Sequence, residues 1–165
     1  MKLNSAIALA LASFAANAMA ATYSIGSLPV APSIYSNVPS VAAGQFSDLY
    51  SFLFPAGAST ASGSAVTVDV ATLLDINNIQ VSLLDAGFAT LAAGGLGESS
   101  LLFNQPLTVG TSYYFKVSGN AAGSAGGAYA FLASAAPVPE PQAYLLMLAG
   151  LAAVGSIVRR RRPRP

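Results

Sequence analysis

Hydrophobic and polar residues alternate along four stretches in the middle of the chain, and this period of two is typical of half-buried β-strands. The stretches are residues 65–71, 79–83, 112–118 and 128–133. Clusters of glycine, asparagine and aspartate separate them, and these residue types favour turns. Short strands at this spacing, without a convincing amphipathic helix between them, predict an all-β fold. We expect an antiparallel β-sandwich of the jelly-roll or Greek-key type over residues 21–136.

The alternation also predicts which side chains share a face of each strand. In the first stretch one face carries Val66, Val68 and Val70, and the other carries Thr67 and Asp69. In the other stretches the predicted apolar faces are Ile79, Val81 and Leu83; Tyr113, Phe115 and Val117; and Tyr129 with Phe131. About 115 residues with such faces are enough for one sandwich-sized core.

An aspartate interrupts an aromatic row in the stretch 45–54. The alternate positions of this stretch are Phe46, Asp48, Tyr50, Phe52 and Phe54. An unpaired carboxylate buried among aromatic rings would cost several kcal/mol, so Asp48 needs hydrogen-bond donors or a place at the edge of the strand. Two interpretations are open. In the simpler one Asp48 accepts backbone N–H groups where the strand begins; in the other it contacts calcium or another ligand.

The first residues of the chain have the pattern of an export signal. Lys2 precedes an apolar stretch over residues 6–16, and Ala18-Met19-Ala20 supplies the small-x-small pattern of a signal-peptidase site. The apolar stretch is too short to span a membrane comfortably. We therefore predict a signal helix over residues 1–20 and cleavage after Ala20, with signal peptidase and the secretion machinery as partners.

The other end of the chain combines an apolar run with a cluster of arginines. As a helix, residues 144–158 would cover about 22 Å of a hydrocarbon core about 30 Å thick, which makes a marginal span. The cluster is predicted to act as a stop-transfer signal, because arginine stays on the cytoplasmic side: Arg159, Arg160, Arg161 and Arg162. The sequence thus predicts a C-terminal transmembrane helix in the inner membrane, with the central domain outside.

A proline-flanked glutamate stands between the predicted domain and the apolar run. Pro139 and Pro141 favour an extended backbone around Glu140, a shape that a peptidase cleft can bind. The order of Val-Pro-Glu-Pro, apolar helix, arginine cluster and chain end, within residues 137–165, resembles the PEP-CTERM sorting signal of exported bacterial proteins. The resemblance implies that an exosortase, an enzyme with a cysteine nucleophile, recognises Pro139, Glu140 and Pro141 and removes the tail. It also implies a Gram-negative bacterium that makes an extracellular polysaccharide.

Two further resemblances concern the central domain. Phe46-x-Asp48-x-Tyr50 is similar to the motif of FxDxF-type PEP-CTERM proteins, with tyrosine in place of the last phenylalanine. Together with VGTSYYFKVSG and GGAYAFLAS downstream, this stretch also resembles bacterial pre-peptidase C-terminal domains in outline. Both resemblances imply a non-catalytic β-sandwich on an exported protein.

Composition narrows the function of the central domain. Only 8% of the chain is charged, and five of its seven basic residues lie in the last seven positions. Residues 21–136 have a net charge of −4, from Asp48, Asp69, Asp75, Asp85, Glu98 and Lys116. This balance argues against nucleic acid as a partner. The sequence has no histidine and no cysteine, which removes Ser-His catalysis and the commonest metal ligand. We expect no enzyme activity, no cofactor and no metal site.

The sequence as a whole favours an exported, non-enzymatic protein of the cell surface or extracellular matrix. The chain would be anchored in the inner membrane before exosortase processing, and would then lie in the cell envelope or outside the cell, with exopolysaccharide and biofilm. One alternative is a carbohydrate- or calcium-binding module, in which Tyr113, Tyr114 and Tyr129 stack on sugars and Asp48 binds calcium. Another is a single-pass membrane protein that is never processed.

Overall fold

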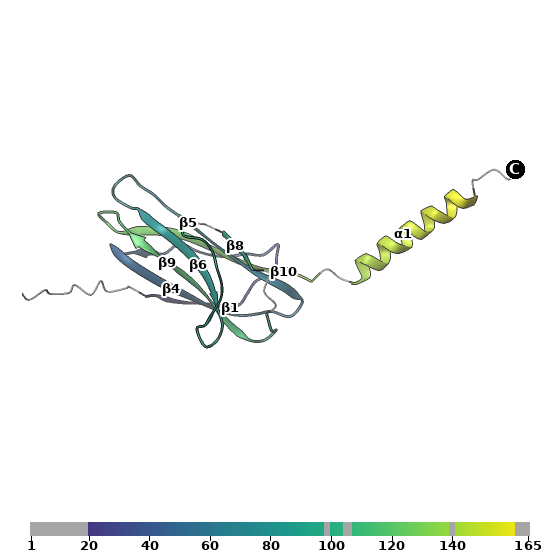
Figure 1. Cartoon of the computed structure of the whole chain (residues 1–165), viewed down its shortest axis with the longest axis horizontal. Coiled ribbons are helices and arrows are strands. Elements are labelled where there is room, and N and C mark those ends of the chain that lie inside the picture. Colours follow the sequence, from purple (N-terminus) through teal and green to yellow (C-terminus); the bar gives the residue numbers. More distant parts are fainter. Residues whose placement is uncertain (1–19, 98–99, 104–106, 139–140, 161–165) are drawn as a thin grey trace, which may run out of the picture.

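The computed structural model describes residues 20–97, 100–103, 107–138 and 141–160 (Figure 1). The predicted signal helix falls, up to residue 19, outside the described residues. In chain order the described elements are β1 (Thr22–Ser27), β2 (Tyr35–Asn37), β3 (Ser40–Val41), β4 (Gly44–Leu53), β5 (Ala58–Thr67), β6 (Ile76–Leu84), β7 (Thr90–Ala93), β8 (Ser100–Phe103), β9 (Ser112–Ala121), β10 (Gly127–Pro137) and α1 (Pro141–Arg160).

The strands form two sheets that pack face to face as a β-sandwich. One sheet has the strand order β1-β4-β9-β6-β7, and the other has the order β2-β10-β5-β8, with β3 paired to β10. Buried side chains from both sheets meet in a single core between them. The predicted β-rich sandwich is therefore confirmed, and its finer jelly-roll or Greek-key assignment stays a prediction.

The prediction of a purely antiparallel sandwich is wrong at one edge. β1 runs parallel to β4, with Thr22 opposite Leu49 and Tyr23 opposite Tyr50. Neighbouring parallel strands need a crossover between them. Residues 28–43 provide it, because this part of the chain leaves the first sheet and forms β2 and β3 against β10. β1 therefore pairs with the edge of β4, and the start of the described chain lies next to the middle of β4.

Alternate residues of the central strands fill the space between the sheets. The predicted inward faces of β6, β9 and β10 are confirmed, because all of these side chains are buried: Ile79, Val81, Leu83, Tyr113, Phe115, Val117, Tyr129 and Phe131. The aromatic rings also stack on one another. Tyr50 packs on Phe131 with ring centroids 4.1 Å apart, and Phe52 packs on Phe115 at 4.6 Å. Such pairs add to the stability that burial of apolar area provides.

β5 differs from its prediction in both extent and orientation. It ends at Thr67 instead of continuing to residue 71. The valines of the prediction are 38–47% exposed: Val66, Val68 and Val70. The buried face of the strand carries small residues instead: Ala61, Gly63 and Ala65. The reason is steric. A Cβ atom at Gly63 would lie 2.9 Å from the ring of Phe115, so the rings of the opposite sheet leave room only for small residues here.

Helix α1 lies beyond the end of the sandwich in Figure 1. It begins at Pro141, which suits the first turn of a helix because proline has no backbone N–H to leave unpaired. The helix contains the predicted apolar run, residues 144–158, and continues to Arg160. No helix in the described part of the chain is long and apolar enough to cross a membrane, so the predicted transmembrane span is not confirmed.

Candidate functional site

Asp48 lies inside the sandwich, in the middle of β4. Its side chain is 2% exposed and stands in the predicted row between Phe46 and Tyr50. The Oδ1 atom accepts a hydrogen bond from the backbone N–H of Ala21 (2.9 Å), and Oδ2 accepts one from the hydroxyl of Tyr129 (2.6 Å). Both carboxylate oxygens therefore have donors, which offsets the cost of removing the group from water.

The hydrogen bonds continue from Asp48 across the core. Since Tyr129 donates to Asp48, the hydroxyl of Tyr50, 2.9 Å away, donates to Tyr129. Burial raises the pKa of Tyr129 far above its ordinary value, and the bond to Asp48 raises it further. Burial likewise raises the pKa of Tyr50. Both phenols therefore stay protonated at neutral pH. The donor that the second sheet offers to Asp48, the hydroxyl of Tyr129, is thus uncharged.

This geometry supports the simpler interpretation of Asp48. The carboxylate accepts a backbone N–H, that of Ala21, but Asp48 lies in the middle of β4 and not where the strand begins, as that interpretation had it. Its second donor, Tyr129, is 81 residues away and belongs to the other sheet. The described residues contain no group of three or more side chains that could hold a metal ion. Asp48 therefore connects the two sheets through polar contacts, and the calcium interpretation stays an untested alternative.

Of the three tyrosines considered for sugar stacking, only Tyr114 reaches the surface. Tyr129 has no exposed area, and Tyr113 is 7% exposed. The hydroxyl of Tyr113 accepts a hydrogen bond from the backbone N–H of Thr108 at 2.9 Å, which fixes it at the end of the core. Tyr114 lies between Tyr113 and Phe115 in β9, and the alternation of the strand turns it to the outer face.

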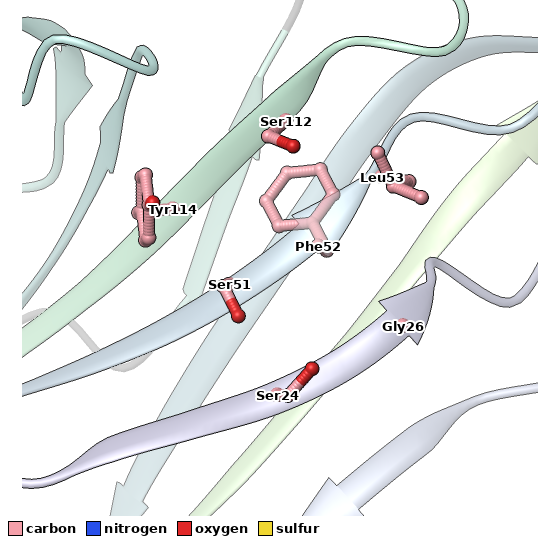
Figure 2. Close-up of a pocket in the computed structure, with 7 residues that line it drawn as sticks. All are labelled: Ser24, Gly26, Ser51, Phe52, Leu53, Ser112 and Tyr114. Carbon is pink, nitrogen blue, oxygen red and sulfur yellow. The ribbon is translucent and has the colours of Figure 1, made fainter.

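An open groove of about 310 Å³ lies beside Tyr114 on the outer face of the first sheet (Figure 2). Its lining comes from the neighbouring strands β1, β4 and β9: Ser24, Gly26, Ser51, Phe52, Leu53, Ser112 and Tyr114. In the register of these strands Ser24 lies opposite Ser51, and Ser51 lies opposite Tyr114. A row of two serine hydroxyls and one phenol therefore crosses the sheet at the groove.

Phe88 extends this surface from the turn between β6 and β7. Its side chain is 56% exposed, and its ring centroid is 4.8 Å from that of Tyr114. The backbone of Phe88 has φ of +64°, which a bulky residue rarely adopts. Asp85 holds the turn, because its Oδ1 accepts hydrogen bonds from the N–H groups of Gly87 (2.8 Å) and Ala89 (2.9 Å). The turn thus keeps an exposed aromatic ring next to the groove.

The C-terminal segment leaves the sandwich at the end of β10. That strand ends at Pro137, and the N–H of Val138 donates to the carbonyl oxygen of Gly57 at 2.8 Å. Pro139 and Glu140 lie outside the described residues, and α1 begins at Pro141. The large apolar side chains of α1 between residues 145 and 155 are exposed: Leu145, Leu146, Met147, Leu148, Leu151 and Val154. The Pro-Glu-Pro stretch therefore joins the last strand directly to an exposed apolar helix.

The order of strand, proline-flanked glutamate, apolar helix and arginines has a counterpart among known protein families. A comparison with these families matches residues 137–162 to the PEP-CTERM protein-sorting motif. The C-terminal segment is a PEP-CTERM sorting motif. The resemblance that the sequence indicated is confirmed, and the sorting motif implies exosortase-dependent sorting of an exported protein.

The sorting motif contains both sets of predicted site residues, which are Pro139, Glu140 and Pro141, and the arginines at 159–162. Arg159 and Arg160 are the last two residues of α1, whereas Arg161 and Arg162 lie outside the described residues. Recognition by exosortase for the first set, and stop-transfer for the second, stay predictions for the individual side chains.

The sandwich in front of the sorting motif is similar to a solved domain. It aligns with the crystal structure of the pre-peptidase C-terminal domain of collagenase from Bacillus anthracis over 72% of this chain and 99% of that chain. The two sequences are 16% identical, and the TM-score is 0.47. This neighbour is of the class that the sequence resembles in outline, whereas the FxDxF resemblance stays a prediction. No curated protein matches the sequence.

Proposed function

We propose that this chain is an exported, non-enzymatic protein of a Gram-negative cell surface or extracellular matrix, and that an exosortase processes it. The observation that carries the proposal is the position of the sorting motif. It begins where the last strand ends, so a cut near Pro-Glu-Pro would leave the sandwich whole. The sandwich would then lie in the cell envelope with exopolysaccharide and contribute to biofilm structure or surface coating.

Before processing, we place helix α1 at the inner membrane. Its exposed apolar side chains would enter the lipid, and the arginines that follow would stay with the cytoplasmic headgroups. This position would hold the Pro-Glu-Pro stretch at the outer surface of the membrane, within reach of a membrane-embedded exosortase. Export would come first, directed by a signal peptide that signal peptidase removes after Ala20.

Replacing Glu140 with alanine should block removal of the tail. The change deletes the charge between the two prolines but keeps the helix and the arginines. In a pulse-chase experiment in cells that make an exosortase, the wild-type chain should shorten during the chase. Most of the E140A chain should stay at full length and bound to the membrane. The control is Gln142→Ala, immediately after Pro141, which should be processed like the wild type. If the wild-type chain also stays full-length and membrane-bound, it is an unprocessed membrane protein and the proposal is wrong.

A specific observation favours a second function of the sandwich, which is the binding of carbohydrate. The groove in Figure 2 combines serine hydroxyls with Tyr114, and Phe88 adds a second exposed ring. Aromatic rings offer apolar faces for stacking, and a few well-placed polar groups orient a ligand. Both kinds of contact are available at this groove, which makes an envelope polysaccharide the candidate ligand.

Replacing Tyr114 with alanine should weaken binding of a soluble exopolysaccharide by about twofold to tenfold, because an aromatic contact contributes about 0.5–1.5 kcal/mol beyond its buried area. Calorimetric titration of the purified protein measures the change. Val66→Ala, on the exposed face of β5, is the control and should leave the affinity unchanged. Equal affinities for the wild type and Y114A would exclude this groove as the binding site.

A further inference from the structure

The backbone of Ala21 is fixed on both sides of the residue. Its N–H donates to Oδ1 of Asp48 at 2.9 Å, and its carbonyl oxygen accepts a hydrogen bond from the N–H of Leu49 at 2.8 Å. The parallel pairing of β1 with β4 continues from the next residue, where Thr22 lies opposite Leu49. The nitrogen of Ala21 is therefore held at a defined point against the buried carboxylate.

The sandwich brings no cationic side chain to this carboxylate. Asp48 is 2% exposed, and its donors in the structure are an amide and a phenol, both neutral. Lys116 is the only lysine or arginine between residues 21 and 136. It lies opposite Leu49 in the register of β4 and β9, whereas Asp48 lies opposite the buried Val117. Lys116 is thus on the outer face, and a buried carboxylate with neutral donors alone carries an uncompensated charge.

The bond next to this carboxylate is the one that the sequence marks for cleavage. Ala18-Met19-Ala20 predicts that signal peptidase cuts between Ala20 and Ala21. Hydrolysis breaks the amide C–N bond: water supplies its hydroxyl to the carbonyl carbon of Ala20 and a hydrogen to the nitrogen of Ala21. The new acid ionises, and the new amine takes up a proton at neutral pH. The atom that donates to Asp48 therefore changes from an amide nitrogen to an ammonium.

We propose that removal of the signal peptide creates a partly buried ion pair between the α-ammonium of Ala21 and the carboxylate of Asp48, and that this pair fastens β1 to the sandwich in the mature protein. The inference rests on the exported state in the proposed function. It links export to the stability of the sandwich, because the donors of Asp48 in the uncleaved chain are neutral and cleavage adds a positive charge beside them.

The surroundings of Ala21 suit an ammonium group. In the uncleaved chain a cavity of about 90 Å³ lies beside it, lined by Ala20, Ala21, Tyr23, Ser40, Val41 and Asp48, and the proposed cut removes the Ala20 part of this lining. That volume admits water, so the two remaining N–H groups of the ammonium can be solvated. The position of the cut also matters. One extra residue in front of Ala21 moves the amino group by about 3.3 Å along the strand. The nitrogen of Ala21 is then again part of a peptide bond, and Asp48 contacts an amide.

Amine labelling tests the ion pair directly, because the chain from Ala21 onward has two amines, the α-amino group and Lys116. The mature protein is purified from exporting cells and treated briefly with an acetylating reagent at pH 8, and peptide mass spectrometry measures both rates. The tyrosines that interact with Asp48 are Tyr23, Tyr50 and Tyr129, and burial raises the pKa of each, so they stay neutral. The pair with Asp48 should raise the pKa of the amine above the pH of the reaction, and each further unit of increase then lowers the deprotonated, reactive fraction about tenfold.

We expect the Ala21 amine to react at least about tenfold more slowly in the wild type than in Asp48→Asn, with Lys116 as the internal standard. Asp69→Asn, which removes an exposed carboxylate, should react like the wild type. If Asp48→Asn does not fold, insertion of one alanine between Ala20 and Ala21 serves instead, since it keeps Asp48 and only displaces the amine. It should abolish the protection.

The outcomes separate the inference from its premise. A mature chain that begins at Ala21 with an amine as reactive as that of the inserted variant overturns the ion pair and leaves export intact. A purified chain that begins at another residue also overturns the inference, because its amino group would not be that of Ala21. A chain that still carries residues 1–20 contradicts export itself.

Discussion

Replacing Phe131 with alanine is expected to lower the free energy of unfolding by about 3–5 kcal/mol. The ring has no exposed area and lies where the two sheets meet, 4.1 Å from Tyr50 and 5.6 Å from Phe115 between ring centroids. Its removal takes away apolar area and leaves a cavity that the β-sheets cannot close, because their backbones are fixed by ladder hydrogen bonds. Domains of this size have a total stability of about 5–15 kcal/mol, so the variant should lose a large share of it. Urea unfolding followed by circular dichroism measures the change.

The matched control for this prediction is Phe88→Ala. Phe88 is 56% exposed, so the same substitution there should change the free energy of unfolding by less than about 1 kcal/mol. Equal losses for the two variants would mean that Phe131 is not part of a packed interface between the sheets, and the arrangement of the core described above would be wrong.

The second large effect is expected at Gly126. Replacing it with alanine should lower the free energy of unfolding by more than about 3 kcal/mol. Gly126 has φ of +96°, where residues with a side chain are strained by about 1–3 kcal/mol. A Cβ atom there would also collide with the carbonyl oxygen of Val41, a backbone atom that cannot rotate away. The same urea titration measures the loss of stability.

Gly110→Ala separates the two causes of that loss. Gly110 has φ of +74°, but an added Cβ would meet no heavy atom within 4 Å. This variant should therefore lose only the strain contribution, about 1–3 kcal/mol. If Gly126→Ala is no less stable than Gly110→Ala, the close contact between the turn at Gly126 and the end of β3 does not exist in solution.

Sequence periodicity predicts correctly the strands whose inward-facing side chains are bulky. The row from Phe46 to Phe54 and the apolar faces of β6, β9 and β10 can be read from the chain, because bulky residues recur at every second position. The pattern gives the wrong inward face for β5 for the opposite reason. Its inward face carries alanine and glycine, which match the rings across the core and give no hydrophobic signal, while its valines face outward. The size of an inward residue depends on its partner in the other sheet, and periodicity contains no information about that partner.

The candidate sites also differ in how far the sequence alone predicts them. The sorting motif is linear, so its parts could be recognised from their order along the chain, and the family comparison confirms it. The environment of Asp48 could be predicted only in part. A need for donors follows from burial, but Tyr129 is 81 residues away, and Ala21 reaches Asp48 only because β1 runs parallel to β4. The groove beside Tyr114 likewise depends on the register of three strands, which single-strand patterns do not determine.

The intact mass of the mature chain tests the central claim most directly. The protein should be purified from two strains of a Gram-negative host, one that makes an exosortase and one from which the exosortase gene has been deleted. We predict that the first strain yields a chain that has lost α1 and the arginines, and that the second retains them. A chain from the first strain whose mass still includes residues 141–165 would contradict the account.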